Sequence, residues 1–478
     1  MYDKPHEECG IFGIYSSSDR DIALDVYFGL FALQHRGQES CGIALNNDGI
    51  INCYKDAGLV DDVFTPESVE NLGKGRIALG HVRYGTSSFN STLEAQPITV
   101  NHIKGSTALV NNGALTNASE LRAALEMQGS IFYSFSDAEV IAQIITRERL
   151  TSSSIEEAIG HAMDRLKGSY SLIVMSATKM IAARDPLGFH PICIGRLSDS
   201  YVFASETAAL DSVGAVFLRD VKPGEVVTVT KDGELISDMS RATSKRTALC
   251  CFEYIYIARP DSVVDGTSVH LARQRLGALL AQQHPVEADV VIGVPDSGLD
   301  AALGYSYESG IPYGIGLIKN KYIGRTFIQP TSDERTTNIR IKLNAITSVV
   351  EGKRVVLVDD SIVRGPTVAR AVKIIREAGA KEIHCRSSAP PFLYPCYYGT
   401  DIKAPEELIA NKMSHDEIGK VLGVDSLGYL DPKSIHLIAP ETSLSLCDAC
   451  FTGNYPTEKR QSDKKPIYMV KLSERDDQ

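Results

Sequence analysis

Two groups of reactive side chains stand out in the amino-acid sequence. Cys9 follows a polar segment of eight residues and begins a short apolar run, Gly10–Ile14. In the second half of the chain, four apolar residues, Val355–Val358, lead directly into Asp359 and Asp360. A thiol becomes a nucleophile once a base takes its proton, and adjacent carboxylates can bind a diol or hydrated Mg²⁺. The sequence therefore offers one candidate for covalent catalysis and one for binding a polar substrate.

The Asp359–Asp360 pair lies where an α/β protein binds its ligands. The run Val355–Val358 predicts a parallel strand buried on both faces, and the segment after the pair predicts a helix that stops at Gly379. Between them, Ser361–Thr367 directs backbone N–H groups and a helix N-terminus at an anion, most naturally a phosphate. Hydroxyl-binding carboxylates beside a phosphate site describe a ribose 5-phosphate. A solvated turn at the end of an ordinary strand is the plainer alternative.

The same stretch resembles the phosphoribosyl-pyrophosphate (PRPP) motif of type I phosphoribosyltransferases. Pro366 stands where that family usually has Thr, and proline lacks an N–H but is tolerated in the first turn of a helix. The resemblance implies that PRPP is bound by the following residues of the motif: Asp359, Asp360, Ser361, Arg364, Gly365 and Thr367.

Two further segments extend the resemblance to phosphoribosyltransferases. Val290–Val294 predicts another buried strand, and the polar loop after it would face pyrophosphate, with Ser297 joining Asp359 and Asp360 in holding one Mg²⁺ per subunit. A basic segment around Gly324 is expected to close over pyrophosphate as a mobile lid, although a solvated charged loop is the alternative. The candidate phosphate contacts in this region are Lys321, Arg325, Arg335 and Lys342.

Four motifs occur in order in the first half, at Cys9–Gly13, Gln34–Ser40, Gly80–Thr86 and Asn111–Asn117. Together they resemble the glutaminase domain of the class II glutamine amidotransferases, which are N-terminal-nucleophile hydrolases. If the cysteine were the first residue of the mature chain, its own α-amino group could take the proton of its thiol. We therefore expect a propeptide, residues 1–8, that is removed by cleavage before the cysteine.

The resemblance also assigns the residues that handle glutamine. The Asn112 side chain and the Gly113 backbone N–H would donate hydrogen bonds to the oxyanion of the tetrahedral intermediate. Arg83 would pair with the α-carboxylate of glutamine, which suits the two parallel donors of a guanidinium group. Asp137 would hold the α-ammonium group. These four residues and the cysteine nucleophile complete the expected glutaminase site.

Plainer structural interpretations exist for some of these residues. Asn112 and Gly113 could form a common Asn-Gly turn. Ser136 and Glu139 also predict a capping box at the start of the helix that contains Asp137. A capping role and a glutamine-binding role can coexist. Arg36 lies in the loop of the second motif, Gln34–Ser40, and is assigned only a supporting role.

The cysteines that remain predict a metal site. Ten cysteines in a long chain without a secretory signal argue for thiols, metal ligands or a nucleophile rather than a disulfide scaffold. Cys447 and Cys450 form a CxxC pair, and Cys250 and Cys396 match ligand positions of an iron–sulfur branch of the two-domain family resembled here. The resemblance implies one [4Fe–4S] cluster per subunit on these four residues. Four thiolates also fit zinc. Because Cys251 is next to Cys250 in the sequence, the spacing does not decide which of the two is the first ligand.

The length of 478 residues and a hydrophobic content of 43% allow two or three domains with full cores. Short strands with turn signals in the first half predict antiparallel sheets covered by helices, which agrees with the αββα sandwich of N-terminal-nucleophile hydrolases. The expected organisation is a propeptide at 1–8, a class II glutaminase domain at 9–235, an α/β type I phosphoribosyltransferase domain with a mostly parallel sheet and a C-terminal cluster-binding segment at 236–456, and a polar tail at 457–478.

Charge and hydropathy exclude several classes of function. The net charge of −11 disfavours nonspecific binding to nucleic acid. No apolar run reaches the length needed to span a membrane, and the N-terminus lacks the pattern of a secretory signal. We therefore expect a cytoplasmic protein that acts on small molecules.

The two halves in this order resemble a family that joins both domains in one chain. The resemblance implies conversion of PRPP, glutamine and water to 5-phospho-β-D-ribosylamine, glutamate and pyrophosphate, the first committed step of de novo purine (IMP) biosynthesis. Ammonia made at Cys9 would pass to the PRPP site. A homotetramer inhibited by purine nucleotides is also implied.

Two other functions are compatible with parts of the sequence. One is an amidotransferase that feeds a different acceptor, which the Asp359–Asp360 loop disfavours. The other is a non-catalytic regulator that senses PRPP. Such a regulator should lack glutaminase motifs and should carry a basic DNA-binding segment, and the sequence meets neither condition.

Overall fold

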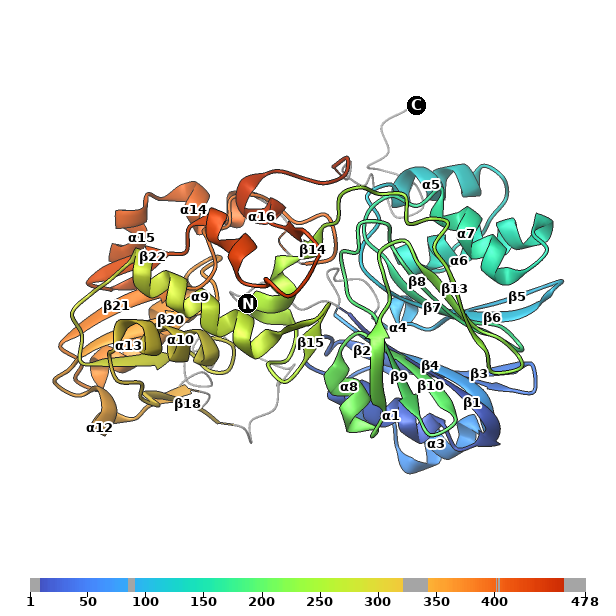
Figure 1. Ribbon diagram of the computed structural model, residues 1–478, viewed down its shortest axis with the longest axis horizontal. Helices are drawn as coiled ribbons and strands as arrows, with labels where there is room; N and C mark the ends of the chain where they lie inside the picture. Colours follow the sequence, from blue (N-terminus) through green and yellow to red (C-terminus); the bar gives the residue numbers. More distant parts are fainter. Residues whose placement is uncertain (1–8, 85–90, 321–342, 401, 403–404, 460–478) are drawn as a thin grey trace, which may run out of the picture.

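The computed structural model describes residues 9–84, 91–320, 343–400, 402 and 405–459. Figure 1 shows two parts that lie side by side. We call the elements from β1 to β13 the N-terminal part and those from β14 onward the C-terminal part. The N-terminal part is built on antiparallel sheets and the C-terminal part on a parallel sheet. Each part carries one of the two candidate sites described below.

The N-terminal part contains two antiparallel sheets packed face to face. Apolar side chains of both sheets, including Ile11, Leu79, Val110 and Ile173, form the buried layer between them. The first sheet has the strand order β11-β9-β10-β1-β4-β2-β3 and comprises β1 (Gly10–Arg20), β2 (Ser40–Asn47), β3 (Ile50–Ala57), β4 (Gly75–Arg83), β9 (Cys193–Leu197), β10 (Ser200–Ala204) and β11 (Val216–Asp220). The second has the order β13-β12-β8-β7-β6-β5 and comprises β5 (Ile98–His102), β6 (Gly105–Asn112), β7 (Ser171–Met175), β8 (Met180–Arg184), β12 (Val226–Val229) and β13 (Leu235–Asp238).

Helices cover the outer face of each sheet, so the predicted αββα sandwich is confirmed (Figure 1). Helices α1, α3 and α8 lie on the first sheet, and α6 and α7 lie on the second. In the described residues no helix is both long and apolar enough to cross a lipid bilayer. The helices of this part are α1 (Ala23–Ala32), α2 (Val60–Val63), α3 (Pro66–Leu72), α4 (Ser91–Glu94), α5 (Ala118–Glu126), α6 (Asp137–Thr151), α7 (Ile155–Met163) and α8 (Thr207–Ser212).

The C-terminal part is built on a four-stranded parallel sheet with the order β17-β20-β21-β22. Its central strand β20 is buried on both faces: Val355 and Leu357 pack in one apolar cluster, and Val356 and Val358 pack in another. The predicted buried strand and the α/β class are therefore confirmed. The strands are β17 (Val290–Gly293), β20 (Arg354–Asp359), β21 (Glu382–Ser387) and β22 (Ser426–Tyr429).

The helix predicted after the Asp-Asp pair is α13 (Pro366–Glu377), and Gly379 follows it with a φ of +94°. This conformation is one that glycine adopts without strain, so the predicted stop is confirmed. The other helices of the C-terminal part are α9 (Val269–Gln283), α10 (Leu299–Ser309), α12 (Thr347–Val350), α14 (Ile409–Lys412), α15 (His415–Leu422) and α16 (Ala449–Thr452), together with the π-helix η1 (Glu253–Ile257) and the 3₁₀ helices η2 (Pro405–Glu407) and η3 (Pro432–Leu437).

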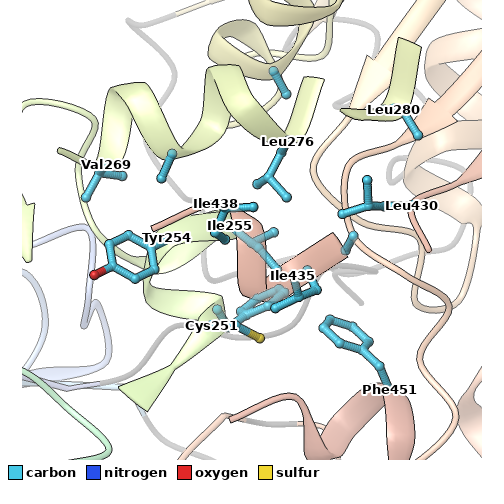
Figure 2. Packing of buried hydrophobic residues seen from close by; sticks show 14 of the residues in the cluster. Cys251, Tyr254, Ile255, Val269, Leu276, Leu280, Leu430, Ile435, Ile438 and Phe451 are labelled. Atoms are coloured by element: carbon cyan, nitrogen blue, oxygen red, sulfur yellow. The ribbon is translucent and has the colours of Figure 1, made fainter. Parts of the chain in front are cut away.

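Small strand pairs complete the C-terminal part. The pair β14 (Leu249–Cys250) and β23 (Leu446–Cys447) is parallel and joins the start of this part to its last helix. Antiparallel pairs are formed by β15 (Val263–Val264) with β16 (Thr267–Ser268) and by β18 (Leu317–Lys319) with β19 (Leu343–Ala345). A large buried cluster around η1 and α9 packs beside β14, and Figure 2 shows Cys251 inside it with Tyr254, Leu276 and Phe451.

Candidate functional site

Cys9 lies at the entrance of β1, the central strand of the first sheet. Its backbone carbonyl accepts a hydrogen bond of 3.1 Å from Nε of Arg36, and its thiol is partly exposed. The next residue, Gly10, has no room for a side chain, because a Cβ there would lie 2.8 Å from a methyl group of Val82. Because the strand begins with a glycine, its backbone next to Cys9 packs closely against Val82 and Leu33.

The predicted oxyanion donors lie at the end of β6, in the facing sheet that packs against β1. The side chain of Asn112 is 1% exposed, and neither of its polar atoms has a hydrogen-bond partner among the described residues. Gly113 has a φ of +126°, and a Cβ there would lie 2.6 Å from the carbonyl oxygen of Ser169. A buried amide with unused hydrogen-bonding capacity is costly in a fold and is what an oxyanion site requires.

A neutral histidine supports this strand end. Burial lowers the pKa of His81 to about 3, so the imidazole is uncharged at neutral pH. Its Nε2 lies 3.1 Å from the carbonyl oxygen of Asn111, the residue before the oxyanion amide. Because a carbonyl oxygen only accepts, Nε2 carries the proton and donates. The histidine thus fixes the backbone that presents Asn112.

The two residues assigned to glutamine recognition occupy different surroundings. Asp137 begins α6, and its Oδ2 accepts a 2.8 Å hydrogen bond from the backbone N–H of Leu115. Arg83 ends β4, and its guanidinium contacts the carboxylates of Glu94 and Glu39. In this state a glutamine carboxylate would compete with Glu94 for the arginine. That acidic pair of neighbours was not expected from the sequence.

One structural expectation is wrong. Ser136 does cap α6, since its Oγ accepts a hydrogen bond from the backbone N–H of Ala138. Glu139 does not close a capping box; its carboxylate instead accepts hydrogen bonds from the backbone N–H groups of Tyr133 and Ser134. The preceding loop curls over the helix start and offers these donors. A spacing rule could not anticipate this competition.

The Asp-Asp pair lies at the carboxyl end of β20, and both residues are fully buried. The carboxylate of Asp360 accepts hydrogen bonds from the hydroxyl of Ser297 and, at 2.5 Å, from that of Ser361. Backbone N–H of Asp360 donates to Oδ1 of Asp359 at 2.9 Å. The structure therefore brings Ser297, from the loop after β17, to the Asp359–Asp360 pair after β20, and these are the three residues predicted to hold Mg²⁺. Carboxylate and hydroxyl oxygens are the hard donors that Mg²⁺ prefers.

The loop after this pair matches the predicted anion site at a helix N-terminus. Gly365 is the N-cap of α13 with a φ of +96°, and Pro366 occupies the first helical position, where its missing N–H costs nothing. Thr367 follows in the first turn. Arg364 forms an ion pair with Glu407, so its guanidinium is directed at η2 in this state.

The basic residues expected to contact phosphates, Lys321, Arg325, Arg335 and Lys342, lie outside the described residues. The strands on either side of them, β18 and β19, pair with each other, so the segment starts and ends at neighbouring points. At its start, Nζ of Lys319 lies 2.8 Å from Oδ2 of Asp296, which is in the polar loop that follows β17. This ion pair ties the base of the segment to the predicted pyrophosphate loop.

The four cysteines predicted to bind a cluster line one apolar cavity: Cys250, Cys396, Cys447 and Cys450. The other lining residues are uncharged, and most are aromatic or aliphatic. Backbone N–H of Tyr398 donates to Sγ of Cys396 at 3.4 Å. Four thiols in an apolar pocket, one of them already accepting an N–H···S bond, are a donor set that fits an iron–sulfur cluster. Within the described ranges, no three His, Cys, Asp or Glu side chains are grouped to hold a single metal ion.

The adjacent cysteine that the sequence left open has a different environment. Cys251 is fully buried in the apolar cluster of Figure 2, whereas Cys250 lines the cavity and pairs in register with Cys447. Burial of Cys41 and Cys385 raises the pKa of each thiol to about 12, which suits inert core residues.

Sequence reasoning missed a buried ionic network beside Cys9. The guanidinium of Arg36 is fully buried and forms 2.7 Å hydrogen bonds to Glu206 and Glu253. Burial alone would raise the pKa of Glu206, but His35 and Arg36 hold it well below its usual range. A signal existed: Glu253 interrupts an apolar run, and a charged residue buried in such a run must be paired.

Comparisons with known proteins identify one domain in each part of the chain. Residues 81–212 match the glutamine amidotransferase domain, and residues 269–426 match the phosphoribosyl transferase domain. The fold and its sites thus define a bifunctional enzyme, a glutamine amidotransferase joined to a phosphoribosyltransferase.

Similar proteins extend over nearly the whole chain. The amidophosphoribosyltransferase of Methanocaldococcus jannaschii is 50% identical over 464 residues, which cover 94% of this chain and 98% of that protein. That of Bacillus subtilis is 46% identical and covers 96% of each chain. A solved structure, glutamine PRPP amidotransferase from B. subtilis complexed with ADP and GMP, has a TM-score of 0.86 at 46% identity, covering 94% of this chain and 98% of its own. The chain belongs to the amidophosphoribosyltransferase family, whose enzymes catalyse the first committed step of purine biosynthesis.

Proposed function

We propose that Cys9 generates ammonia from glutamine and that the Asp359–Asp360 site transfers this ammonia to PRPP. The products are 5-phospho-β-D-ribosylamine, glutamate and pyrophosphate. The observation that carries the proposal is the presence of two separate polar sites in one chain. One is the unpartnered buried amide of Asn112, in the sheet facing Cys9; the other is the buried cluster of Asp360 with Ser297 and a second serine.

The glutaminase step uses groups of the N-terminal part. The α-amino group of Cys9 takes the proton of the thiol, and the sulfur attacks the amide carbon of glutamine. The Asn112 amide and the Gly113 N–H stabilise the oxyanion that forms. As the intermediate collapses, the α-ammonium group returns its proton to the leaving nitrogen, the C–N bond breaks and ammonia is released. Water then hydrolyses the thioester to glutamate. Asp137 binds the α-ammonium group of glutamine, and Arg83 binds its α-carboxylate.

In the second step ammonia attacks C1 of the ribose with inversion and the C1–O bond to pyrophosphate breaks. The carboxylates of Asp359 and Asp360 bind the ribose hydroxyls, and the loop Ser361–Thr367 binds the 5-phosphate at the start of α13. Mg²⁺ held by Ser297 and the two carboxylates would supply positive charge to the leaving group. Because ammonia is mostly protonated and unreactive at neutral pH, an enclosed path between the sites is part of the proposal.

The separation of the two sites can be tested with one substitution. Cys9→Ala removes the sulfur that forms the thioester and leaves the C-terminal part unchanged. The variant should lose activity with glutamine but keep activity with ammonium salts and PRPP. Loss of both activities in a folded variant would contradict two separable sites.

Removal of residues 1–8 is also proposed, because the α-amino group can serve as the base only when Cys9 is the first residue. An attack of the thiol on the Glu8 carbonyl is the proposed route. N-terminal sequencing of active protein should begin at cysteine. An intact Met1 in fully active protein would contradict the proposal.

We further propose a [4Fe–4S] cluster in the cavity lined by Cys250, Cys396, Cys447 and Cys450. The apolar lining and the N–H···S bond to Cys396 support it. Protein purified without oxygen should be coloured and contain about four irons and four sulfides per chain. One zinc ion per chain without sulfide would favour the alternative metal.

Nucleotide binding, assembly and location complete the proposal. The B. subtilis structure contains ADP and GMP, which supports feedback inhibition by purine nucleotides in this chain. Activity should fall as GMP or ADP is added at fixed PRPP. We propose a homotetramer in the cytoplasm, and analytical ultracentrifugation should give four chains per particle. A monomer at working concentrations would contradict the assembly.

A further inference from the structure

The carbonyl of Cys9 is held by an arginine whose other donors are engaged by two carboxylates. Nε of Arg36 donates to that carbonyl at 3.1 Å. Nη1 and Nη2 donate to the two oxygens of Glu253 at 2.9 and 2.7 Å, and Nη1 also donates to Glu206 at 2.7 Å. All three charged side chains are fully buried. A planar guanidinium group whose two Nη atoms both donate to one carboxylate has a fixed orientation, so its Nε–H also points in a fixed direction.

The carboxylate that orients the arginine comes from the C-terminal part. Glu253 is the first residue of η1, a π-helix, which is a conformation often found at functional sites. Buried Arg273 of α9 donates to the backbone carbonyls of Tyr254, Tyr256 and Ala258, which holds this short helix in place. Nδ1 of His190, in the N-terminal part, also lies 3.2 Å from Oε1 of Glu253, the oxygen that Nη2 of the arginine contacts.

The second carboxylate is also bound from the C-terminal part. Glu206 follows β10, and its Oε2 accepts hydrogen bonds from the Ser262 hydroxyl at 2.7 Å and from the backbone N–H of Arg259 at 2.9 Å. Its Oε1 contacts His35 as well as Arg36. One of the two carboxylates that fix the arginine, and two of the donors that hold the other, therefore come from residues 253–262 of the C-terminal part.

We infer that Glu253 is a positioning residue for the glutaminase reaction and acts through Arg36 on the backbone of Cys9. The inference rests on the proposed role of Cys9 as nucleophile. In that role one residue supplies both the thiol and the base, so the orientation of a single backbone unit sets the geometry of both groups. The glutaminase site is then incomplete until the phosphoribosyltransferase part is in place, which couples ammonia release to the presence of its acceptor domain.

The test is Glu253→Gln, which keeps the size of the side chain but removes one acceptor and the charge. One guanidinium nitrogen loses its acceptor on residue 253, so the paired bonds that fix the plane of the arginine are reduced to one, while the bonds to Glu206 and to the carbonyl of Cys9 remain. With glutamine as substrate, kcat should fall roughly 10- to 100-fold, as for other small misplacements of a catalytic group. KM for glutamine should change less than about twofold, because Arg83 and Asp137 are untouched. Activity with ammonium salts and PRPP should stay within about twofold of the unchanged protein.

A matched control exists at the same junction. Arg184 is fully buried and forms a two-pronged ion pair with Asp265 of the C-terminal part, at 2.8 Å for each bond. Asp265→Asn should lower the melting temperature but leave kcat with glutamine unchanged, because the described bonds of Asp265 are to Arg184 rather than to Arg36 or Glu253. An equal loss of glutamine kcat in both variants would show that only docking matters and would overturn the inference.

A second variant covers the case in which Glu253→Gln does not fold. His190→Gln removes the ring contact to Glu253 while leaving the arginine pair, and it should lower glutamine kcat in the same direction by a smaller factor. Full glutamine kcat in the folded variants, with Cys9→Ala inactive, would overturn this inference alone. Glutamine activity in Cys9→Ala would instead overturn the proposed function.

Discussion

Asp137 Oδ2 accepts a 2.8 Å hydrogen bond from the backbone N–H of Leu115. This bond joins the acid assigned to the α-ammonium group of glutamine to the loop that follows the oxyanion donors Asn112 and Gly113. The same carboxylate is therefore in a position to serve substrate binding and to hold the oxyanion loop. Two functions on one side chain give a kinetic signature that a binding residue alone would not show.

Asp137→Asn should raise KM for glutamine at least about tenfold and should also lower kcat. The first effect follows from the lost charge opposite the ammonium group, and the second from replacing an acceptor of the Leu115 N–H by an amide that can turn its NH₂ toward it. Steady-state glutaminase kinetics measure both. A change in KM with an unchanged kcat would show that the Leu115 bond has no catalytic consequence.

Asn112→Ala should lower kcat with glutamine by about 10²- to 10³-fold with little change in KM, which is the usual cost of one oxyanion donor. The buried amide has no partner among the described residues, so its removal should not reduce stability. The melting temperature serves as the control and should stay the same or rise. A large loss of stability would indicate a structural role instead.

Ser297→Ala should raise the Mg²⁺ concentration needed for half-maximal activity with ammonium salts and PRPP. Its hydroxyl bonds the carboxylate of Asp360, and its loss leaves the metal with one protein oxygen fewer. The glutaminase step measured alone should be unaffected. Ser309→Ala, at the last residue of α10, where the hydroxyl accepts a hydrogen bond from the backbone N–H of Ile311, provides a comparison. An unchanged Mg²⁺ dependence would remove Ser297 from the metal site.

Cys250→Ala should abolish the iron and sulfide content of purified protein, and Cys251→Ala should retain it. Cys250 lines the cavity with the other three cysteines, whereas Cys251 packs in the apolar cluster of Figure 2. The second variant should lose stability by roughly 1 to 2 kcal/mol, as a small core truncation does. Iron and sulfide analysis of both variants decides the choice that adjacency in sequence left open.

Stability should depend on pH through Asp220. Burial, together with the carboxylate of Asp265, raises the pKa of Asp220 to about 7 from an ordinary value of 3.8. The folded protein therefore binds a proton that the unfolded chain has released, so this stabilisation is complete below about pH 4 and is lost as pH rises through 7. Asp220→Asn does not titrate, so it should raise the melting temperature more at pH 8 than at pH 5. An equal difference at both values would contradict the shifted pKa.

The local pattern of the sequence was sufficient for the elements that carry the chemistry. A run of four apolar residues before Asp359 predicted a strand buried on both faces, because no alternation of polar residues was present. Alternating strands and turns predicted the two antiparallel sheets. Gly379 predicted the end of α13 because few other residues adopt its backbone conformation. These features depend on neighbours within a few positions.

Contacts between distant segments could not be predicted in the same way. Ser136 and Glu139 matched a capping box, but backbone donors from the preceding loop competed for Glu139. Arg36 was assigned only support because its carboxylate partners lie about 170 and 217 positions further along the chain. Spacing rules apply within one helix or strand, whereas a buried ion pair depends on which distant elements pack together.

Strands β14 and β23 set Cys250 opposite Cys447 in a parallel pair. A ribosome completes both antiparallel sheets and the whole parallel sheet before it reaches the second of these strands. The four cysteines of the cavity can therefore come together only after every other strand of the described chain has been made. A chain that stops before residue 446 lacks Cys447 and Cys450, two of the four cysteines that line the cavity.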